Sequence, residues 1–112
     1  MKHAYVIGLD YGTDSVRALL VDALTGQEID SEVALYSRWN KGLYSDPRVA
    51  RFRQHPDDYL EALRAAVCAV TGRHADLASD IRALSVDTTA STPCLTDKAG
   101  VPLSLHEKYA EN

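Results

Sequence analysis

The sequence predicts an α/β fold: a three-stranded antiparallel meander, one helix, a fourth strand parallel to an earlier one, and a small C-terminal hairpin. Two short apolar runs, Ala4–Leu9 and Val16–Val21, flank a polar turn, and a third run, Ile81–Val86, lies much later in the chain. Runs of this length, rich in Val, Ile and Leu and bounded by small polar residues, are typical of strands. The stretch with a helical period precedes the third run, so we expect that strand to return in parallel through a right-handed crossover.

The first two runs are apolar at nearly every position, which predicts a hairpin with both faces of its sheet covered. Gly26 follows in a turn position that favours a left-handed residue. The segment Gln27–Tyr36 alternates imperfectly between apolar and polar residues, as an edge strand does. The segment Ser37–Arg53 has no period, and we expect an ordered loop in which its Trp and Tyr side chains pack.

A helix is expected from about His55 to Gly72. Pro56 suits its first turn, and the two aspartates that follow complement its positive end. Its apolar residues recur with a 3.6-residue period and define the face that should pack: Tyr59, Leu60, Leu63, Ala66, Val67 and Val70. The remaining segments are expected to form a helical turn (Asp76–Asp80), the small hairpin (Cys94–Thr96 with Val101–Leu105) and a polar tail (His106–Asn112).

Composition places the chain among ordinary globular domains: of 112 residues, 46% are apolar and 25% are charged. A net charge of −4 without any basic run argues against nucleic-acid binding. The first apolar run is too short for a signal peptide or a membrane span, and Cys68 and Cys94 are expected to be reduced thiols, which predicts a cytoplasmic protein. The sequence has no P-loop, dinucleotide-binding, zinc-binding or nucleophile-elbow motif.

The turn after the first strand combines residues that suit a phosphate group and a divalent cation. Gly12 can adopt conformations closed to other residues and leaves no side chain between the main chain and a ligand. Successive N–H groups around such a turn form an anion site, to which Thr13 and Ser15 add hydroxyls and Arg17 a permanent positive charge. Asp10 is a hard oxygen ligand of the kind that holds magnesium, directly or through water. The alternative is a hairpin turn whose side chains satisfy only local backbone groups.

The predicted topology brings a second polar loop, Thr88–Thr92, to the same place. If the fourth strand lies parallel beside the first, Asp10 and Asp87 stand at the carboxyl ends of neighbouring strands, where ligands bind in sheets of this type. The loops Tyr11–Ser15 and Thr88–Thr92 would then face one crevice. The alternative for the second loop is a cluster of turn-forming and cap-forming residues.

The stretch GLDYGTDSVRALLVD, at Gly8–Asp22, resembles the first phosphate-binding motif of the FGGY family of carbohydrate kinases, within the actin/hexokinase/Hsp70 superfamily. Further stretches resemble one branch of that family in particular: Arg38–Gly42, Phe52–Leu63, Ser85–Gly100 and Tyr109–Asn112. The resemblance runs in one register from Tyr5 to Asn112. It implies a ribonuclease H-like (actin-like ATPase) fold, left as an incomplete domain in a chain of this length.

The resemblance also implies a role for each matching residue of the turn. Asp10 would help to hold Mg²⁺ through water. Gly12 and Thr13, and with them Ser15, would contact the phosphates of ATP. Arg17 would reach toward the γ-phosphate. Positioning and charge neutralisation of this kind supply most of the catalysis in phosphoryl transfer.

The loop that would lie beside the sugar consists of Thr88, Thr89, Ala90 and Ser91. Thr89 and Ala90 stand where other members of the family place larger polar residues, so their small side chains would leave room for a five-carbon ketose. Members of the family are several times longer than this chain, and the aspartate that acts as their general base lies downstream. No catalytic base is therefore expected here.

We expect residues 1–112 to be an N-terminal fragment of the first kinase domain, without turnover of its own. An open apolar edge on its fourth strand predicts self-association. The alternatives are a fragment of another branch of the family, a stand-alone phosphate-binding module with a regulatory role, and an actin-like assembly domain without catalysis.

Overall fold

The structure is a computed structural model that describes residues 2–88 and 93–109. Four strands, β1 (Tyr5–Tyr11), β2 (Ser15–Asp22), β3 (Glu28–Leu35) and β6 (Ile81–Thr88), form one sheet in the order β3–β2–β1–β6. The first three pair antiparallel in sequence order, and β6 lies parallel to β1. The predicted meander and the parallel fourth strand are both confirmed.

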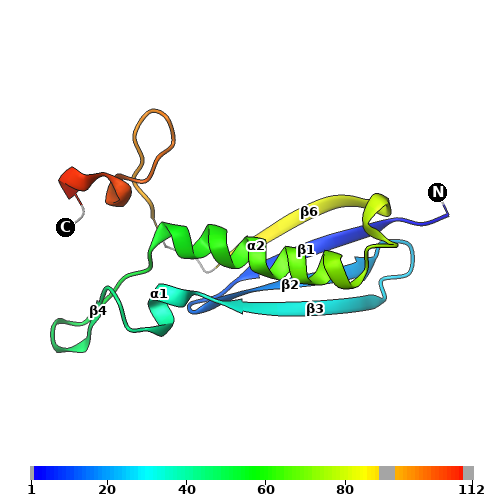
Figure 1. The fold of residues 1–112 in the computed structure, drawn as a ribbon, viewed down its shortest axis with the longest axis horizontal. Coiled ribbons are helices and arrows are strands. Elements are labelled where there is room, and N and C mark those ends of the chain that lie inside the picture. The colour runs from blue at the N-terminus through cyan, green and yellow to red at the C-terminus, as the bar shows by residue number, and fades with distance from the viewer. Residues whose placement is uncertain (1, 89–92, 110–112) are drawn as a thin grey trace.

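Helix α2 (Pro56–Arg73) lies along one face of this sheet (Figure 1). Its start is as predicted: Pro56 opens the first turn, and His55 Nδ1 accepts a hydrogen bond of 3.1 Å from the Asp57 N–H. The helix ends one residue beyond the predicted Gly72.

The packed face of α2 is as predicted except at one position, because Tyr59, Leu63, Ala66, Val67 and Val70 lie in the core or pack against it. Its fully buried residues are Asp58, Ala62, Ala66 and Val70, whereas Leu60 is 66% exposed. The prediction for Leu60 is therefore wrong. Small Ala62 and Ala66 let the helix approach the sheet closely, and a line through Ala62, Ala66 and Val70 leaves Leu60 on the outside.

The core lies between α2 and the meander. On the sheet side, Val16, Ala18 and Leu20 of β2 are completely buried, and Ile7 and Leu9 of β1 are nearly so. Each fully buried aliphatic side chain of this size contributes about 1.5–3 kcal/mol relative to an exposed one. Burial therefore fixes the register of the hairpin, because a slip by one residue would turn these side chains to the other face.

The prediction that both faces of the sheet are covered is wrong for the described residues. Val33 and Leu35 of β3 point away from α2 and are exposed. On the α2 side, Leu84 and Val86 of β6 are 50% and 56% exposed, because the helix lies over β2 and β3. An unbroken apolar run predicts a strand that could be buried on both faces, but it cannot supply the elements that would cover them.

The segment predicted to be a loop between β3 and α2 holds short elements: α1 (Ser37–Asn40), and a small hairpin of β4 (Ser45–Asp46) and β5 (Arg51–Phe52). The carboxylate of Asp58, on α2, accepts hydrogen bonds of 3.2 Å from the N–H groups of Arg38 and Trp39 and so caps α1. Trp39 packs against the core as predicted, whereas Tyr44 is exposed.

The later segments differ from the predictions in detail. A 3₁₀ turn at Ala78–Asp80 confirms the helical turn before β6. The predicted C-terminal hairpin is reduced to one bridge between Thr96 and Pro102, and two 3₁₀ turns follow, at Leu103–Leu105 and Glu107–Tyr109. The last three residues of the predicted polar tail lie outside the described residues.

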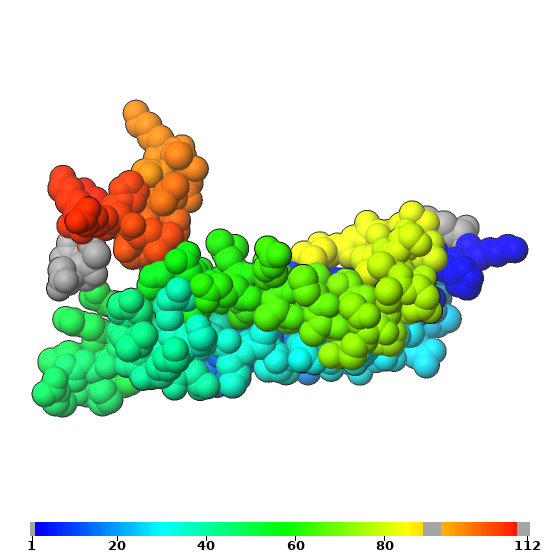
Figure 2. All heavy atoms as spheres, viewed as in Figure 1, coloured from blue at the N-terminus to red at the C-terminus, as the bar shows by residue number. Residues whose placement is uncertain are grey.

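The molecule is elongated, with extents of 53 × 32 × 23 Å. The β4–β5 hairpin and the C-terminal segment both project from the end of the sheet where β1 and β6 finish (Figure 1). The space-filling view shows a notch between the C-terminal segment, in orange and red, and the body of the protein (Figure 2). The predicted site therefore lies at the end of the molecule from which these two segments project.

Candidate functional site

The two aspartates predicted to meet at one edge of the sheet do so. Asp10 and Asp87 are register partners in the parallel pairing of β1 with β6, each close to the carboxyl end of its strand. The next pair in the ladder, Tyr11 with Thr88, brings the starts of the two polar loops together. This register confirms the shared edge that the sequence predicted.

Arg17 lies in the same row of the sheet. It is the register partner of Asp10 across the β1–β2 hairpin, so Arg17, Asp10 and Asp87 stand side by side on three neighbouring strands. Their alternation with Leu9, Val16 and Ala18, which are buried under α2, places all three on the opposite face. This face therefore presents one cation and two carboxylates beside the polar turn.

The turn itself, residues 12–15, is held from inside the chain. Each of its four carbonyl oxygens accepts a hydrogen bond. Tyr36 Oη donates to the Gly12 carbonyl at 2.9 Å, and Gln54 Nε2 donates to the Thr13 carbonyl at 2.5 Å. The Tyr36 N–H donates to the Asp14 carbonyl, and the Gly12 N–H donates to the Ser15 carbonyl, both at 2.8 Å. In the described part of the chain, the Thr13 and Asp14 N–H groups have no acceptor. The turn thus directs its acceptors inward and keeps donors available for an anion.

Gly12 does not use the conformational freedom that the sequence suggested. Positive φ angles occur at Gly26, as predicted, and at Gly42 and Gly100, but not at Gly12. A Cβ placed on Gly12 would lie 3.5 Å from the Ser15 carbonyl oxygen, an ordinary contact. The contribution of Gly12 to the site is therefore an uncovered main chain that a ligand can approach.

The hydroxyl residues of the site are only partly described. Thr13 is exposed and Ser15 half-buried at the turn. Thr88 ends β6, and its N–H donates to Asp87 Oδ1 at 3.0 Å. Thr89, Ala90 and Ser91 lie outside the described residues. Their predicted place beside a sugar stays a prediction.

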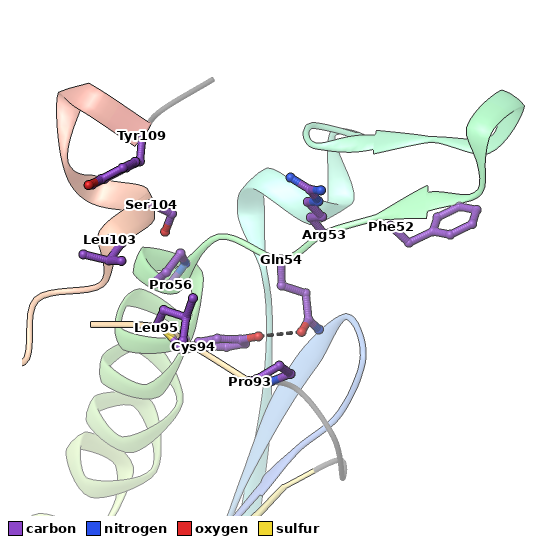
Figure 3. Close-up of a pocket in the computed structure, with 11 residues that line it drawn as sticks. Phe52, Arg53, Gln54, Pro56, Pro93, Cys94, Leu95, Leu103, Ser104 and Tyr109 are labelled. Atoms are coloured by element: carbon purple, nitrogen blue, oxygen red, sulfur yellow. Dashed lines mark hydrogen bonds between the residues drawn. The ribbon is translucent and has the colours of Figure 1, made fainter. Parts of the chain in front are cut away.

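A cavity of about 760 Å³ opens next to the turn, between the start of α2 and the C-terminal segment (Figure 3). Gln54, Pro56 and Tyr59 line it on one side, and Pro93–Leu95, Leu103, Ser104 and Tyr109 on the other. Gln54 also donates to Thr13 of the turn, so the cavity and the turn share a side chain. In the sequence, Pro93 of its lining follows the predicted sugar loop, and most of the lining side chains are apolar or aromatic.

Sequence reasoning missed Gln54, Tyr36 and Tyr59 as parts of this site. Tyr36 is completely buried, and burial raises the pKa of its phenol, so the hydroxyl stays a donor to Gly12. Burial likewise raises the pKa of Tyr59, whose hydroxyl donates to Gln54. Gln54 lay within a stretch that carried the family resemblance, but its chemistry alone did not distinguish it from a surface glutamine.

Arg38 and Asp58, also within stretches that carried the resemblance, form a structural cluster behind the site. Arg38 donates to Asp58 Oδ1 at 2.9 Å and to both carboxylate oxygens of Glu61. Burial by itself raises the pKa of Asp58, but hydrogen bonds from the Arg38 side chain and from the Arg38 and Trp39 N–H groups lower it below its usual value. The cluster fixes α1 to α2 and stays ionised at neutral pH.

The known proteins that this chain resembles are sugar kinases. No family model matches the sequence. The chain is 49% identical over 109 residues to the ribulokinase of Vibrio parahaemolyticus, a match that covers 96% of the chain and 19% of the relative. It is 37% identical over 117 residues to the ribulokinase of Halalkalibacterium halodurans, covering 100% of the chain and 21% of the relative. The chain is a homologue of part of ribulokinase.

This homology confirms the resemblance to FGGY sugar kinases and to the branch that Arg38–Gly42 and Ser85–Gly100 suggested, which is the ribulokinase branch. The chain spans about a fifth of the length of the ribulokinases that it matches. In structure it is similar to a xyloylose kinase from Brucella ovis, with a TM-score of 0.73 and 24% identity over 86% of this chain and 18% of that one. The predicted fold, a piece of an actin-like ATPase domain, is confirmed.

Three further findings concern the described residues alone. None of their helices is long and apolar enough to cross a membrane. They contain no group of three or more His, Cys, Asp and Glu side chains arranged to hold a metal ion. Cys68 and Cys94 are free and exposed.

Proposed function

We propose that this chain forms the phosphate-binding part of an ATP-dependent ribulokinase. The longer protein would convert L-ribulose and ATP to L-ribulose 5-phosphate and ADP, a step of L-arabinose catabolism in the cytoplasm. One observation carries the proposal: Asp10 and Asp87 are register partners, with the donor-rich turn directly after Asp10. Homology to ribulokinases supports the choice of sugar kinase.

The residues of the turn would bind and orient the terminal phosphates of ATP. The Thr13 and Ser15 hydroxyls and the free N–H groups of the turn donate to phosphate oxygens, and Arg17 balances negative charge from the adjacent row of the sheet. Asp10, a carboxylate exposed on the same face as Asp87, fits a hard cation held through water. Mg²⁺ at that place would neutralise phosphate charge during transfer.

The sugar would lie between the loop Thr88–Ser91 and the adjoining cavity. Small residues at Thr89 and Ala90 would leave room for a five-carbon ketose, and the cavity of about 760 Å³ opens directly after this loop. In the intact enzyme, replacing Ala90 by Trp should raise the KM for L-ribulose. An unchanged KM would contradict this placement of the sugar.

The chain alone should not turn over. Its proposed place is the N-terminal part of the first kinase domain, residues 1–112, whereas the general-base aspartate of such kinases lies in a downstream motif. Exposed Leu84 and Val86, on the edge strand β6, make self-association the expected state of the isolated chain. A monodisperse monomer in light scattering at micromolar concentration would contradict this. Nucleic acid and membranes are not among the proposed partners.

The proposed function is tested with a chimera, in which this chain replaces part of a known ribulokinase. The 112 residues replace the matching segment of the Vibrio parahaemolyticus ribulokinase, and kinase activity is measured with L-ribulose and Mg-ATP. Activity is expected to persist and to fall by at least about a hundredfold in Asp10→Asn and Arg17→Ala, because charge at the phosphates is lost. Arg64→Ala, on the exposed surface of α2, is the control and should leave activity unchanged.

A chimera that stays fully active with Asp10→Asn and Arg17→Ala would exclude these residues from catalysis. A chimera that prefers D-xylulose or D-ribulose over L-ribulose would assign the chain to another FGGY kinase.

A second function, a stand-alone phosphate-binding module, is favoured by one observation. All four carbonyl oxygens of the turn are tied by groups of this chain, so the donors are arranged without help from a second lobe. Titration calorimetry of the isolated chain with Mg-ATP separates the two functions. Measurable affinity would support the module, and heat of mixing alone would favour a segment that binds only within the longer kinase.

A further inference from the structure

The orientation of the turn follows from the groups that hold its carbonyls. A trans peptide is planar, so the C=O of one residue and the N–H of the next point in opposite directions. The Thr13 carbonyl points at Gln54 Nε2, which turns the Asp14 N–H away from Gln54. The Gly12 carbonyl likewise points at Tyr36 Oη and turns the Thr13 N–H outward. The direction of each free donor is thus set by a side chain behind the turn.

Gln54 is itself held in one orientation. Its amide faces a carbonyl, which can only accept, so the NH₂ group lies toward Thr13 and the oxygen toward Tyr59. The Tyr59 hydroxyl donates to that oxygen, and the Tyr11 hydroxyl donates to the Tyr59 carbonyl at 3.1 Å. Figure 3 shows Gln54 extended toward the β1–β2 turn, with its hydrogen bond as a dashed line.

The tyrosines around Gln54 are fixed by packing as well as by hydrogen bonds. The Tyr59 ring meets the Tyr36 ring edge-on at 5.5 Å between centroids, and the Tyr11 ring at 5.9 Å. Such pairs add about 0.5–1.5 kcal/mol beyond the area they bury. Gln54 therefore stands on a rigid support that reaches from the start of α2 to the end of β1.

We propose that Gln54, held by Tyr59, is a positioning residue that fixes the Thr13–Asp14 peptide so that the Asp14 N–H donates to a bound phosphoryl group. The inference rests on the proposed function, because it needs the turn to bind phosphate. It adds two groups to the site: the Asp14 main chain, which touches the ligand, and Gln54, which acts through the peptide.

The experiment uses the whole chain, labelled with ¹⁵N, and inorganic triphosphate with Mg²⁺ as the probe. Gln54→Met keeps the length of the side chain and removes its donor. Gln27→Met is the matched control, because Gln27 is the other glutamine of the sequence and lies exposed in the turn between β2 and β3. Tyr59→Phe, which keeps the ring and removes only the hydroxyl, tests the support of Gln54 independently of the substitution at Gln54.

Gln54→Met is expected to weaken triphosphate binding about five- to tenfold, since one hydrogen bond is lost. Tyr59→Phe should weaken binding about threefold, and Gln27→Met should leave it unchanged. In the free protein, Gln54→Met should move the Asp14 amide resonance while that of buried Leu20 stays in place, which a general loss of structure would not do.

Equal affinity of the unmodified chain and Gln54→Met would overturn the inference and leave the phosphate site standing. Equal affinity of Tyr59→Phe alone would overturn the role given to Tyr59. Absence of triphosphate binding by the unmodified chain would overturn the inference, because the Asp14 N–H would then have no phosphoryl group to bind in this chain, and it would leave phosphate binding to the longer kinase.

Discussion

Strands β2 and β6 have similar apolar sequences, but their side chains differ in burial. Both present aliphatic side chains toward the α2 side of one sheet. On β2, Val16 and Leu20 are completely buried, whereas on β6 Leu84 and Val86 are about half exposed. The difference lies in α2, which packs mainly on β2 and β3. An apolar pattern thus specifies a strand, but its burial depends on which neighbour the chain provides.

The largest test of this comparison is a matched pair of truncations. Leu20→Ala should lower the free energy of unfolding by about 2–5 kcal/mol, because it opens a cavity under α2. Leu84→Ala should change it by no more than about 0.5 kcal/mol, because the side chain is already in contact with solvent. Urea unfolding followed by circular dichroism measures both. Similar losses in the two variants would mean that β6 is covered in solution.

A second test concerns what holds α2 to the buried side. Asp58→Ala removes the cap of α1 and the partner of Arg38, and should cost about 2 kcal/mol. Asp57→Ala, which alters the neighbouring, more exposed carboxylate, should cost about 0.5 kcal/mol or less. If the two losses in thermal unfolding are equal, the Asp58 cluster does not anchor the helix.

The ion pairs at the C-terminal end of α2 should make the stability of the protein depend on pH. Hydrogen bonds from Arg73, from the Ser31 N–H and from His74 lower the pKa of Asp30 from 3.8 to about 2. Because the folded-state pKa is the lower one, this stabilisation is present above about pH 4 and is lost as the pH falls toward 2. Asp30→Asn should therefore flatten the decline of the melting temperature between pH 5 and 2, slightly because the pairs are on the surface.

Asp76→Asn is the control for this pH dependence, because it removes the same charge from an exposed aspartate just beyond α2 that is not a partner of Arg73. It should leave the curve of melting temperature against pH unchanged. A flattening as large as that of Asp30→Asn would show that the effect comes from overall charge rather than from the Arg73 cluster.

A substitution on the half-exposed edge strand β6 is expected to have the smallest effect on stability and a clear effect on self-association. Val86→Lys places a charge on the half-exposed part of the edge strand and should leave the free energy of unfolding within about 0.5 kcal/mol. It should also shift the isolated chain toward the monomer in light scattering. Val101→Lys, in the C-terminal segment, is the control, and an equal shift there would place the self-association elsewhere.

The parts of the structure that sequence could predict are those set by local pattern. The hairpin, the start of α2 at Pro56 and the pairing of Asp10 with Asp87 followed from periodicity, capping residues and the rule for crossovers. The parts that escaped depend on tertiary partners. Asp58 read as an acid at the start of its own helix but caps another, and Gln54 acquires its role only where the turn lies beside it.

The edge where Asp10 meets Asp87 has a consequence for dynamics. Pairing of β1 with β6 closes a loop of more than 70 residues, whereas the hairpins of the meander close loops of a few residues. Because β6 buries little apolar surface to offset the entropic cost of closing this loop, it should be the last strand to join the sheet during folding and the first to detach from it. The two sides of the proposed crevice are therefore joined by the least stable strand pairing of the sheet. Any partner that stabilises the pairing of β6 with β1 would also stabilise the site.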